Sequence, residues 1–245
     1  MLPRFFAPDA TASAAVVALS DDEAGHLTRV LRLGPGDPIR VFDGRGHEWE
    51  AAVEEVRRGE ASVRLGPPIE PMREAGVSIT LVAAVLKADH MDAVVRDAVM
   101  LGAAAIVPLL TEHTEVTARV VDRGGRIARW RRIAIASAKQ CGRAVVPPVH
   151  EALPIADALA QPAAAARIML TEPSASGPGT VALSQLPRAA GAELLIGPEG
   201  GWTVGERQLA TASGCILVTL GAHTLRAAAA PIVAMTAVRA MWGDL

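Results

Sequence analysis

The 245-residue chain lacks the features that define several large classes of protein. Its two cysteines, Cys141 and Cys215, are too few for a disulfide framework and do not have metal-ligand spacing. No stretch of about 18 uninterrupted apolar residues is present, and the N-terminal MLPRFFAPDA lacks the apolar core of a signal peptide. We therefore expect two reduced thiols that pack in the interior, no metal, and a soluble cytoplasmic protein.

Familiar catalytic arrangements are also missing. The sequence shows no Ser-His-Asp order, no zinc-ligand spacing and no paired set of carboxylates. Its six histidines are scattered, at positions 26, 47, 90, 113, 150 and 223. Each is expected to be a surface or packing residue and not a ligand.

Lysine is nearly absent, since 22 of the 24 basic residues are arginine, and the net charge is −2. This balance argues against a general nucleic-acid binder, because phosphate contacts need clustered basic side chains. Residues 119–143 are the exception, with eight Arg and Lys against one Asp, so that this segment carries +7 and the remainder −9. The segment predicts a solvated helix face or a polyanion-binding patch, and the size of the excess favours the patch.

The first 70 residues contain short apolar runs with near-alternation, as in HEWEAAVEEV and ASVRL, separated by turn signals. They predict a small, mostly β unit. DDEAGHLTRVLRL interrupts the pattern with apolar residues at helical spacing, and Ser20 precedes it as a helix N-cap. GPPIEPMREAG, residues 66–76, predicts a linker. We place two domains at residues 1–72 and 73–245.

From residue 77 onward, strands alternate with helices. VSITLVAAVL is a continuous apolar run, typical of a strand covered on both faces, and a helix ending at Gly102 follows it. Further strands are predicted at AAIVPLL, RIMLT, AELLIG and CILVTL, with a helix over about residues 127–141. The alternation predicts a mostly parallel α/β sheet with ligands at the carboxyl ends of its strands.

The most informative segment is ELLIGPEGGWTVGE, residues 193–206. A strand runs into the turn GPEGG, and Thr203 with Glu206 forms a capping box that starts a helix. Glycines at such a turn let a ligand approach the backbone and leave N–H groups free to bind it. The turn is neither a P-loop nor a dinucleotide fingerprint. It predicts either a ligand site or a tight turn without one.

Two other strand ends should lie beside this turn. They are MLTEPSASGPG, which contains Leu170, and LGAHTLR, which begins at Leu220. Together the three loops offer many backbone groups, the acids Glu172 and Glu199, and Arg226. Such a pocket suits a flat, mostly neutral heterocycle better than a triphosphate. Glu199 is equally well explained as an acid at a helix N-terminus.

The helix predicted at residues 127–141 is amphipathic. Trp130 and Ala134 share its apolar face, while the arginines lie mostly on the other side. Trp130 is therefore expected in the core and not as a platform for a base. In KQCGR, Gln140 and Arg143 flank the glycine that ends the helix, where side chains can reach a neighbouring cleft.

Several of these segments match the motifs of one family in its order: PRFF, HLTRVLRLGPGD with VFDG, RWRRIAIASAKQCGR, LLIGPEGGW, LGAHTLR and WGDL. From end to end the chain resembles the bacterial 16S rRNA (uracil-N3)-methyltransferases known as RsmE, of the SPOUT superfamily. So many motifs in the right order make chance a poor explanation.

The resemblance implies an N-terminal PUA-like β-barrel that helps to bind RNA and an α/β SPOUT domain with a trefoil knot. It implies a homodimer that acts on 16S rRNA or the small ribosomal subunit. It also implies S-adenosyl-L-methionine as the cofactor, held by the same three loops. The cofactor-binding residues carried over are Leu170, Thr171, Glu172, Pro173, Ile196, Gly197, Pro198, Glu199, Gly200, Gly201, Leu220, Gly221, Leu225 and Arg226.

The chemistry that the resemblance implies is modest. Because a sulfonium already activates the methyl group, the protein must align uracil N3, help to remove its proton and stabilise the developing anion. Arg226 and Arg143 are the candidates for the stabilising positive group, with Arg226 alternatively a bridge between loop and helix. No metal is needed. Candidate RNA contacts are Arg4, Arg29, Arg32, Arg129, Arg132, Gln140 and Arg143.

The chain departs from the family near this site. The family commonly reads Leu-Arg-Thr-Glu-Thr-Ala where this chain has LRAAAA, with Ala228 at the Glu position. His90 stands where a basic residue is usual. In isolation the alanines predict helix filler ahead of Pro231, which a helix tolerates in its first turn. The resemblance instead implies that LRAAAAP is the rim of the cofactor and uracil pocket, without the hydroxyls and the carboxylate of the family.

Three functional hypotheses stay open. The first is an active S-adenosylmethionine-dependent rRNA methyltransferase. The second is a SPOUT paralogue with an altered RNA substrate or weakened catalysis, acting as an RNA-binding or ribosome-assembly factor. The third is a small-molecule-binding α/β protein with an accessory β-domain, which the overall acidity suggests.

Overall fold

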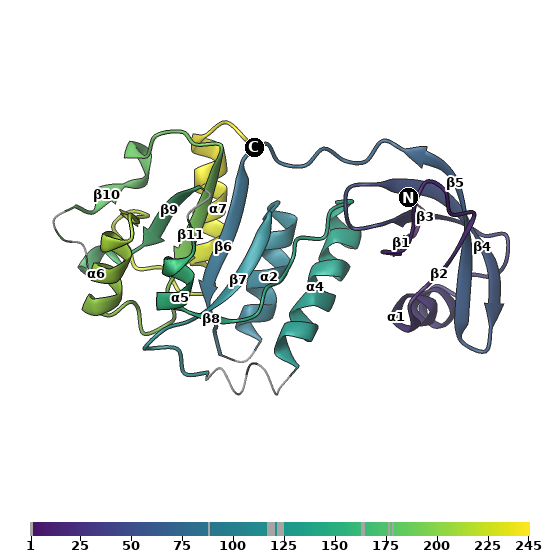
Figure 1. Ribbon diagram of the computed structural model, residues 1–245, viewed down its shortest axis with the longest axis horizontal. Helices are drawn as coiled ribbons and strands as arrows, with labels where there is room; N and C mark the ends of the chain where they lie inside the picture. Colours follow the sequence, from purple (N-terminus) through teal and green to yellow (C-terminus); the bar gives the residue numbers. More distant parts are fainter. Residues whose placement is uncertain are drawn as a thin grey trace. The chain divides into compact units, whose positions relative to one another are not determined.

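The computed structural model describes residues 2–87, 89–116, 121, 125–162, 165–175, 177 and 179–245 (Figure 1). The chain divides into two compact units. Unit 1 comprises Met1–Glu74 and Ile135–Val146, and unit 2 comprises Ala75–Ala134 and Pro147–Leu245. No pattern in the sequence indicates that residues 135–146 return to unit 1, and a boundary between residues 72 and 73 stays a prediction.

Unit 1 contains a five-stranded mixed sheet in the order β1-β3-β4-β5-β2. Its strands are β1 (Arg4–Phe6), β2 (Val16–Ala18), β3 (Pro38–Phe42), β4 (Glu48–Arg57) and β5 (Glu60–Ile69). β1 pairs with β3 in parallel, and the other neighbours are antiparallel. Alternate residues of β5, Ala61 and Val63, enter one apolar core with Phe5 and Ile39. The predicted small β unit is confirmed.

β5 is longer than the sequence predicts. The segment GPPI continues the strand, and Pro68 and Ile69 lie opposite Trp49 and Glu48 of β4. The proline that faces away from β4 fits because β2 covers β5 only at residues 62–64, and on the other side the register with β4 shifts between Trp49 and Ala51, opposite this segment. The linker prediction is therefore wrong for residues 66–69.

The helical interruption of unit 1 is in the predicted place but differs in kind. It consists of α1 (Asp21–Gly25) and a π-helical turn, η1 (His26–Val30). Ser20 caps α1 as predicted, and its Oγ accepts a hydrogen bond from the Glu23 N–H at 3.4 Å. Because the π-helical turn changes the spacing, Leu27 is buried whereas Val30 is 65% exposed.

Unit 2 contains a seven-stranded sheet in the order β10-β12-β9-β11-β6-β7-β8, with every neighbouring pair parallel. Its strands are β6 (Ser78–Ala84), β7 (Ala105–Leu110), β8 (Leu153–Pro154), β9 (Ala166–Leu170), β10 (Val181–Ala182), β11 (Gly191–Ile196) and β12 (Ile216–Thr219). All five predicted strands are present, which confirms the parallel α/β sheet. The two-residue strands β8 and β10 have no pattern in the sequence that indicates them.

Helices cover this sheet (Figure 1). α2 (His90–Met100) packs against α7 (Ala230–Met241), and α7 lies on β6 and β11. α5 (Ile155–Ala160) packs against α6 (Val204–Ala212), with α5 on β7 and α6 on β12. Successive residues Leu194 and Leu195 of β11 are both buried, as expected for a strand covered on both faces. α4 (Arg126–Cys141) begins in unit 2 and ends in unit 1, and η2 (Pro173–Ala175) and η3 (Leu183–Gln185) are short 3-10 turns.

None of the described helices combines the length and the apolarity that a membrane crossing requires.

The C-terminal end of unit 2 is tied to its first strand by Asp244. Its carboxylate accepts hydrogen bonds from the N–H groups of Gly76 and Val77 at 2.7 and 3.0 Å and forms an ion pair with Arg239. Arg239 is buried and donates to the Gly102 carbonyl at 2.8 Å. Burial opposes ionisation of Asp244, but the two N–H groups and Arg239 outweigh it and lower the pKa of the carboxyl.

Candidate functional site

A pocket of about 620 Å³ lies at the carboxyl ends of β9, β11 and β12 in unit 2. The three strand ends meet there because β9 pairs with both β11 and β12. Of the predicted cofactor residues, all except Gly221 line the pocket. The other lining residues are His90, Ala175, Trp202, Arg207, His223, Thr224, Ala227, Ala228 and Ala230.

Hydrogen bonds join the three loops to one another. The indole Nε1 of Trp202 donates to the Leu170 carbonyl at 2.8 Å, and the Thr171 N–H donates to the Val218 carbonyl at 2.8 Å. Arg207 of α6 donates to the Ala175 carbonyl at 3.1 Å. The pocket walls are therefore held by hydrogen bonds among the loops, β12 and α6.

The glycine turn favours glycine at Gly201 through its backbone conformation, and at Gly197 through a close contact. Gly201 has a φ of 67°, and a Cβ built there would lie 3.1 Å from the Glu172 carboxylate. A Cβ on Gly197 would lie 3.1 Å from the Trp202 ring. Both glycines thus allow close approach of backbone and side chain within the pocket wall.

A fourth loop, after β7, supports the turn and was missed by the sequence analysis. His113 Nδ1 lies 2.8 Å from the Gly200 carbonyl oxygen and 3.1 Å from that of Gly201. Since both partners are acceptors, Nδ1 carries the proton and donates. The one signal available was the position of His113 just beyond a parallel strand, because its partners lie 87 and 88 residues away.

Glu206 links this fourth loop to α6. The predicted capping box is present, with the Thr203 Oγ1 accepting from the Glu206 N–H at 3.2 Å and the Glu206 carboxylate accepting from the Thr203 N–H at 2.8 Å. The other oxygen of the buried Glu206 carboxylate accepts from the Glu112 N–H at 2.9 Å. The cap therefore also fixes the loop that carries His113.

Of the charged residues that line the pocket, Glu199 and Arg226 are exposed, whereas Glu172 and Arg207 are half-buried. Glu199 has His90 as its near neighbour, with His90 Nδ1 3.9 Å from the carboxylate. Lys87 forms an ion pair with Glu115, and that contact raises the pKa of Lys87. Within the part of the chain that the structure describes, the Arg226 guanidinium has no hydrogen-bond or ion-pair partner. Glu199 and Arg226 can therefore both meet a ligand.

The alanine segment borders the pocket, where Ala227, Ala228 and Ala230 are lining residues. It forms a turn and not a helix, since α7 begins only at Ala230, whose N–H donates to the Arg226 carbonyl at 3.0 Å. Pro231 stands in the first turn of α7, as expected. The interpretation in isolation as helix filler is therefore wrong for residues 227–229, and the run lies at the pocket, as the resemblance implies.

The predicted RNA contacts differ in exposure. The exposed members are Arg29, Arg32, Arg129, Arg132 and Gln140, with Arg129 in an ion pair with Asp92. Arg4 and Arg143 are only 9% and 6% exposed, and their side chains are bonded inside unit 1. Arg143, also a predicted catalytic residue, is not among the residues that line the pocket.

Other predictions for α4 and the cysteines have mixed outcomes. Trp130 is buried as predicted, and its Nε1 donates to Asp92 at 3.1 Å.

The two cysteines differ in burial, since Cys215 is buried, whereas Cys141 is partly exposed. Arg119 and Arg123, which contribute to the basic segment, lie outside the described residues, as does Asp122.

The described residues contain no group of three His, Cys, Asp or Glu side chains arranged to hold a metal ion.

Comparison with known proteins identifies the class of both units. Residues 73–239 match the family model described as an RNA methyltransferase domain, and residues 19–66 match the RNA methyltransferase PUA domain. The seven-stranded parallel sheet and the N-terminal unit agree with the predicted SPOUT and PUA-like architecture. The trefoil knot stays a prediction.

Individual relatives carry a more specific name. The ribosomal RNA small subunit methyltransferase E of Synechocystis is 34% identical over 93% of this chain and 74% of that protein. The enzyme of that name from Neisseria gonorrhoeae, solved with S-adenosyl methionine, has a TM-score of 0.88 and 32% identity over 99% and 98% of the two chains. A methyltransferase from Legionella pneumophila, solved with the same cofactor, has a TM-score of 0.90 and 27% identity over 98% of each chain. The chain therefore belongs to the RNA methyltransferase family, in the group of ribosomal RNA small subunit methyltransferase E.

Proposed function

We propose that the protein transfers the methyl group of S-adenosyl-L-methionine to N3 of a uridine in the 16S rRNA of the small ribosomal subunit. The observation that carries this proposal is the meeting of three loops in one pocket, in a chain of this family. The cofactor in two similar structures supports the same cofactor here, and the names of the relatives support a small-subunit rRNA substrate.

The pocket suits such a cofactor in size and chemistry. Its volume of about 620 Å³ lies within the usual range for small-molecule sites, about 300–1,000 Å³. Leu170, Ile196 and Leu220 offer apolar contact to an adenine ring, and Glu199 offers a negative charge to a cationic ligand. When bound, the cofactor supplies a methyl group activated by its sulfonium.

Arg226 is the catalytic candidate that we retain. It lies at the pocket, exposed, so that its positive charge can stabilise the negative charge that develops on the uracil oxygens when N3 loses its proton. Arg143 does not fit this role, because its guanidinium is buried against Glu74 in unit 1. The exposed residues Arg29, Arg32 and Arg132 remain candidate phosphate contacts. A homodimer and a cytoplasmic location stay predictions.

The direct test is methyl transfer by the purified protein. Labelled S-adenosylmethionine and small-subunit particles that lack the modification should yield N3-methyluridine, identified by mass spectrometry of digested rRNA. Arg226→Ala should reduce the rate by about a hundredfold or more, as the loss of one group that stabilises a developing anion does. An exposed arginine outside the pocket, Arg188→Ala, is the matched control. Label found on another nucleoside, or none transferred, would contradict the proposal.

A second candidate is a paralogue with weakened catalysis or another RNA substrate. The observation that favours it is the pocket-lining position of Ala227 and Ala228, where the resembled family has polar residues. Ala228→Glu should then raise the transfer rate while S-adenosylmethionine binds with unchanged affinity, because backbone groups provide most of the pocket. Equal rates for the two forms would show that the alanines do not limit catalysis.

A further inference from the structure

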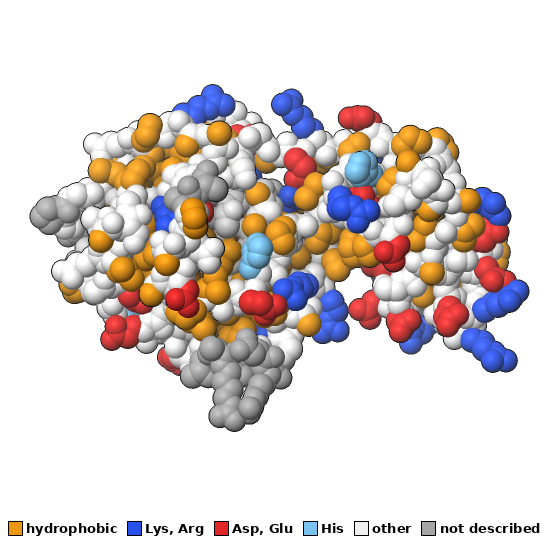
Figure 2. Space-filling model, viewed as in Figure 1, with side chains coloured by type: hydrophobic (Ala, Val, Ile, Leu, Met, Phe, Trp, Pro, Cys, Tyr) orange, Lys and Arg blue, Asp and Glu red, His pale blue; other side chains and the backbone are white. Residues whose placement is uncertain are grey.

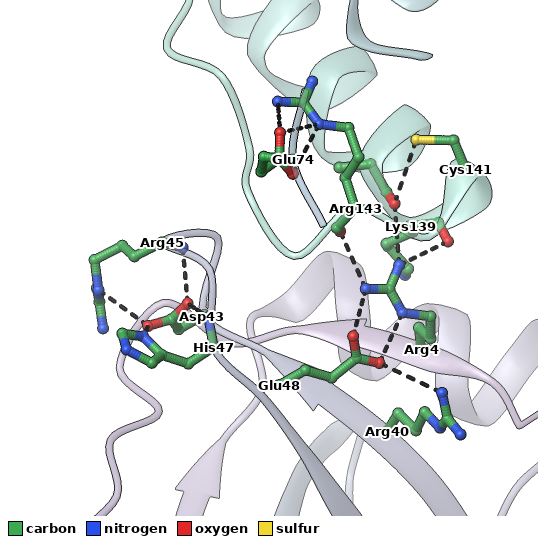
Figure 3. A network of polar contacts seen from close by, with 11 residues as sticks. Arg4, Arg40, Asp43, Arg45, His47, Glu48, Glu74, Lys139, Cys141 and Arg143 are labelled. Carbon is green, nitrogen blue, oxygen red and sulfur yellow. Dashed lines mark hydrogen bonds and ion pairs between the residues drawn. The ribbon is translucent and has the colours of Figure 1, made fainter. Parts of the chain in front are cut away.

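A buried polar network in unit 1 surrounds the side chain of Arg4 (Figure 3). Its Nε and one terminal nitrogen donate to the two carboxylate oxygens of Glu48 at 3.0 and 2.9 Å. The other terminal nitrogen donates to the carbonyls of Ala138 and Lys139 at 3.0 and 3.1 Å, and a further bond of 3.0 Å reaches the Arg143 carbonyl. The guanidinium thus joins β1 and β4 to the end of α4.

This contact serves the end of a helix. The last carbonyls of an α-helix have no partner within the helix, and a positive charge beside them is favourable. Gly142, with a φ of 90°, ends α4, and Arg4 binds the carbonyls that remain. Glu48, 4% exposed, balances the charge of Arg4. The network therefore fixes where α4 stops.

The two cations of KQCGR are neutralised within unit 1. Lys139 Nζ contacts the Glu23 carboxylate at 2.9 and 2.6 Å. The Arg143 guanidinium donates to the Glu74 carboxylate at 2.6 and 2.9 Å. Gln140 lies between them in sequence, and its side chain is exposed with no hydrogen bond to any described residue. The polar group that this segment offers to a ligand is an amide.

We propose that Arg4 and Glu48 are positioning residues that hold the end of α4 so that the amide of Gln140 contacts a base of the RNA substrate. The inference rests on the proposed function, which supplies RNA as the ligand. An amide both donates and accepts hydrogen bonds, so that it can read the edge of an unpaired base, whereas phosphates are bound by cations. Lys139 and Arg143 are parts of the network and contact no phosphate.

Salt dependence separates a base contact from a phosphate contact. In filter binding to small-subunit rRNA between about 50 and 200 mM salt, Gln140→Ala should weaken binding by the same factor at every salt concentration, about fivefold to tenfold. Arg132→Ala, the matched phosphate-contact control, should reduce the slope of log K against log salt by about 0.7–0.9. Binding by Gln140→Ala that equals the wild type, or a changed slope, overturns the assignment.

A second variant tests the positioning role. Arg4→Met combined with Glu48→Met replaces the ion pair by apolar side chains of similar size, an exchange that proteins often tolerate. RNA affinity should fall by about tenfold, and adding Gln140→Ala should cause no further loss, because the amide is already misplaced. Binding of S-adenosylmethionine by calorimetry should stay unchanged. Arg40→Gln is the control, since its guanidinium is 41% exposed and 4.0 Å from Glu48.

The outcomes distinguish this inference from the function on which it rests. Wild-type protein that neither binds nor methylates small-subunit particles overturns the proposed function. If the wild-type protein binds and methylates these particles, two results overturn the positioning role alone. The first is full RNA affinity of the Met/Met variant. The second is a loss of affinity from Gln140→Ala that is as large in the Met/Met variant as in the wild type. If the Met/Met variant does not fold, Arg4→Lys retains the charge without the forked donors and is read by the same additivity.

Discussion

The pocket of unit 2 and the Arg4 network of unit 1 differ in how their charged side chains are placed. Glycines, apolar side chains and polar side chains line the pocket, and two of its charged residues, Glu199 and Arg226, are exposed. The network consists of buried charges that are paired with one another, as in Arg4 and Glu48. On the face shown in Figure 2, charges of both signs are spread over unit 1, whereas the left part of unit 2 is mostly uncharged. The loss of one member of a buried network leaves another charge buried without its partner, whereas an exposed charge at the pocket stays solvated.

Breaking the Arg4 network should give the largest loss of folding stability. Glu48→Ala leaves the buried Arg4 guanidinium without its counter-charge and should destabilise the protein by about 3–5 kcal/mol. Urea denaturation measures the change in the free energy of unfolding. Glu54→Ala is the control, because the ion pair of Glu54 with Arg64 is exposed and is worth about 1 kcal/mol or less. Similar losses in the two variants would show that the Arg4 pair contributes no more than a surface pair.

A smaller loss of stability is expected at Asp244 of unit 2, which binds backbone N–H groups outside the pocket. Asp244→Asn weakens two hydrogen bonds and an ion pair, and should cost about 2 kcal/mol at pH 7. Because the pKa of Asp244 is lowered by folding, its contribution is present above the unfolded pKa of about 3.9 and disappears as the pH falls through the folded value. Unfolding measured at several pH values should show wild type and Asp244→Asn converging in acid. A difference that persists there would contradict this account, and Asp9→Asn, on an exposed residue, is the control.

The smallest effect is expected at the pocket, where one side chain supports the backbone wall. His113→Ala removes the donor to the Gly200 and Gly201 carbonyls and should weaken S-adenosylmethionine binding by about fivefold, equivalent to roughly 1 kcal/mol. Calorimetric titration measures the affinity for S-adenosylmethionine. His113→Asn should restore part of the affinity through its amide donor, and His150→Ala, on another exposed histidine, should have none of the effect. Unchanged binding by His113→Ala would show that the backbone of the turn holds its conformation without His113.

The sequence predicts the pocket much better than the network, for a physical reason. The pocket follows from strand ends that each carry a local signal, and a parallel sheet brings such ends to one edge. Arg4 gives no such signal, since its partners lie 44 residues away at Glu48 and 134 or more residues away in α4. A buried arginine and a surface arginine look alike in a sequence, so that the sequence does not distinguish Arg4 and Arg143 from the exposed arginines predicted as RNA contacts. The π-helical turn and the extension of β5 were missed because tertiary pairing decided them.

The two prolines at the end of β5 also affect how copies of this protein meet one another. Beyond β2, that stretch of β5 presents a side that no described strand covers, and an uncovered strand edge is a template for another extended chain. Pro67 and Pro68 have no N–H group to donate, and because successive N–H groups of a strand point to opposite sides, an approaching strand finds one of these gaps in the ladder that it would need. The same residues that lengthen the sheet of unit 1 therefore protect it from aggregation at that edge.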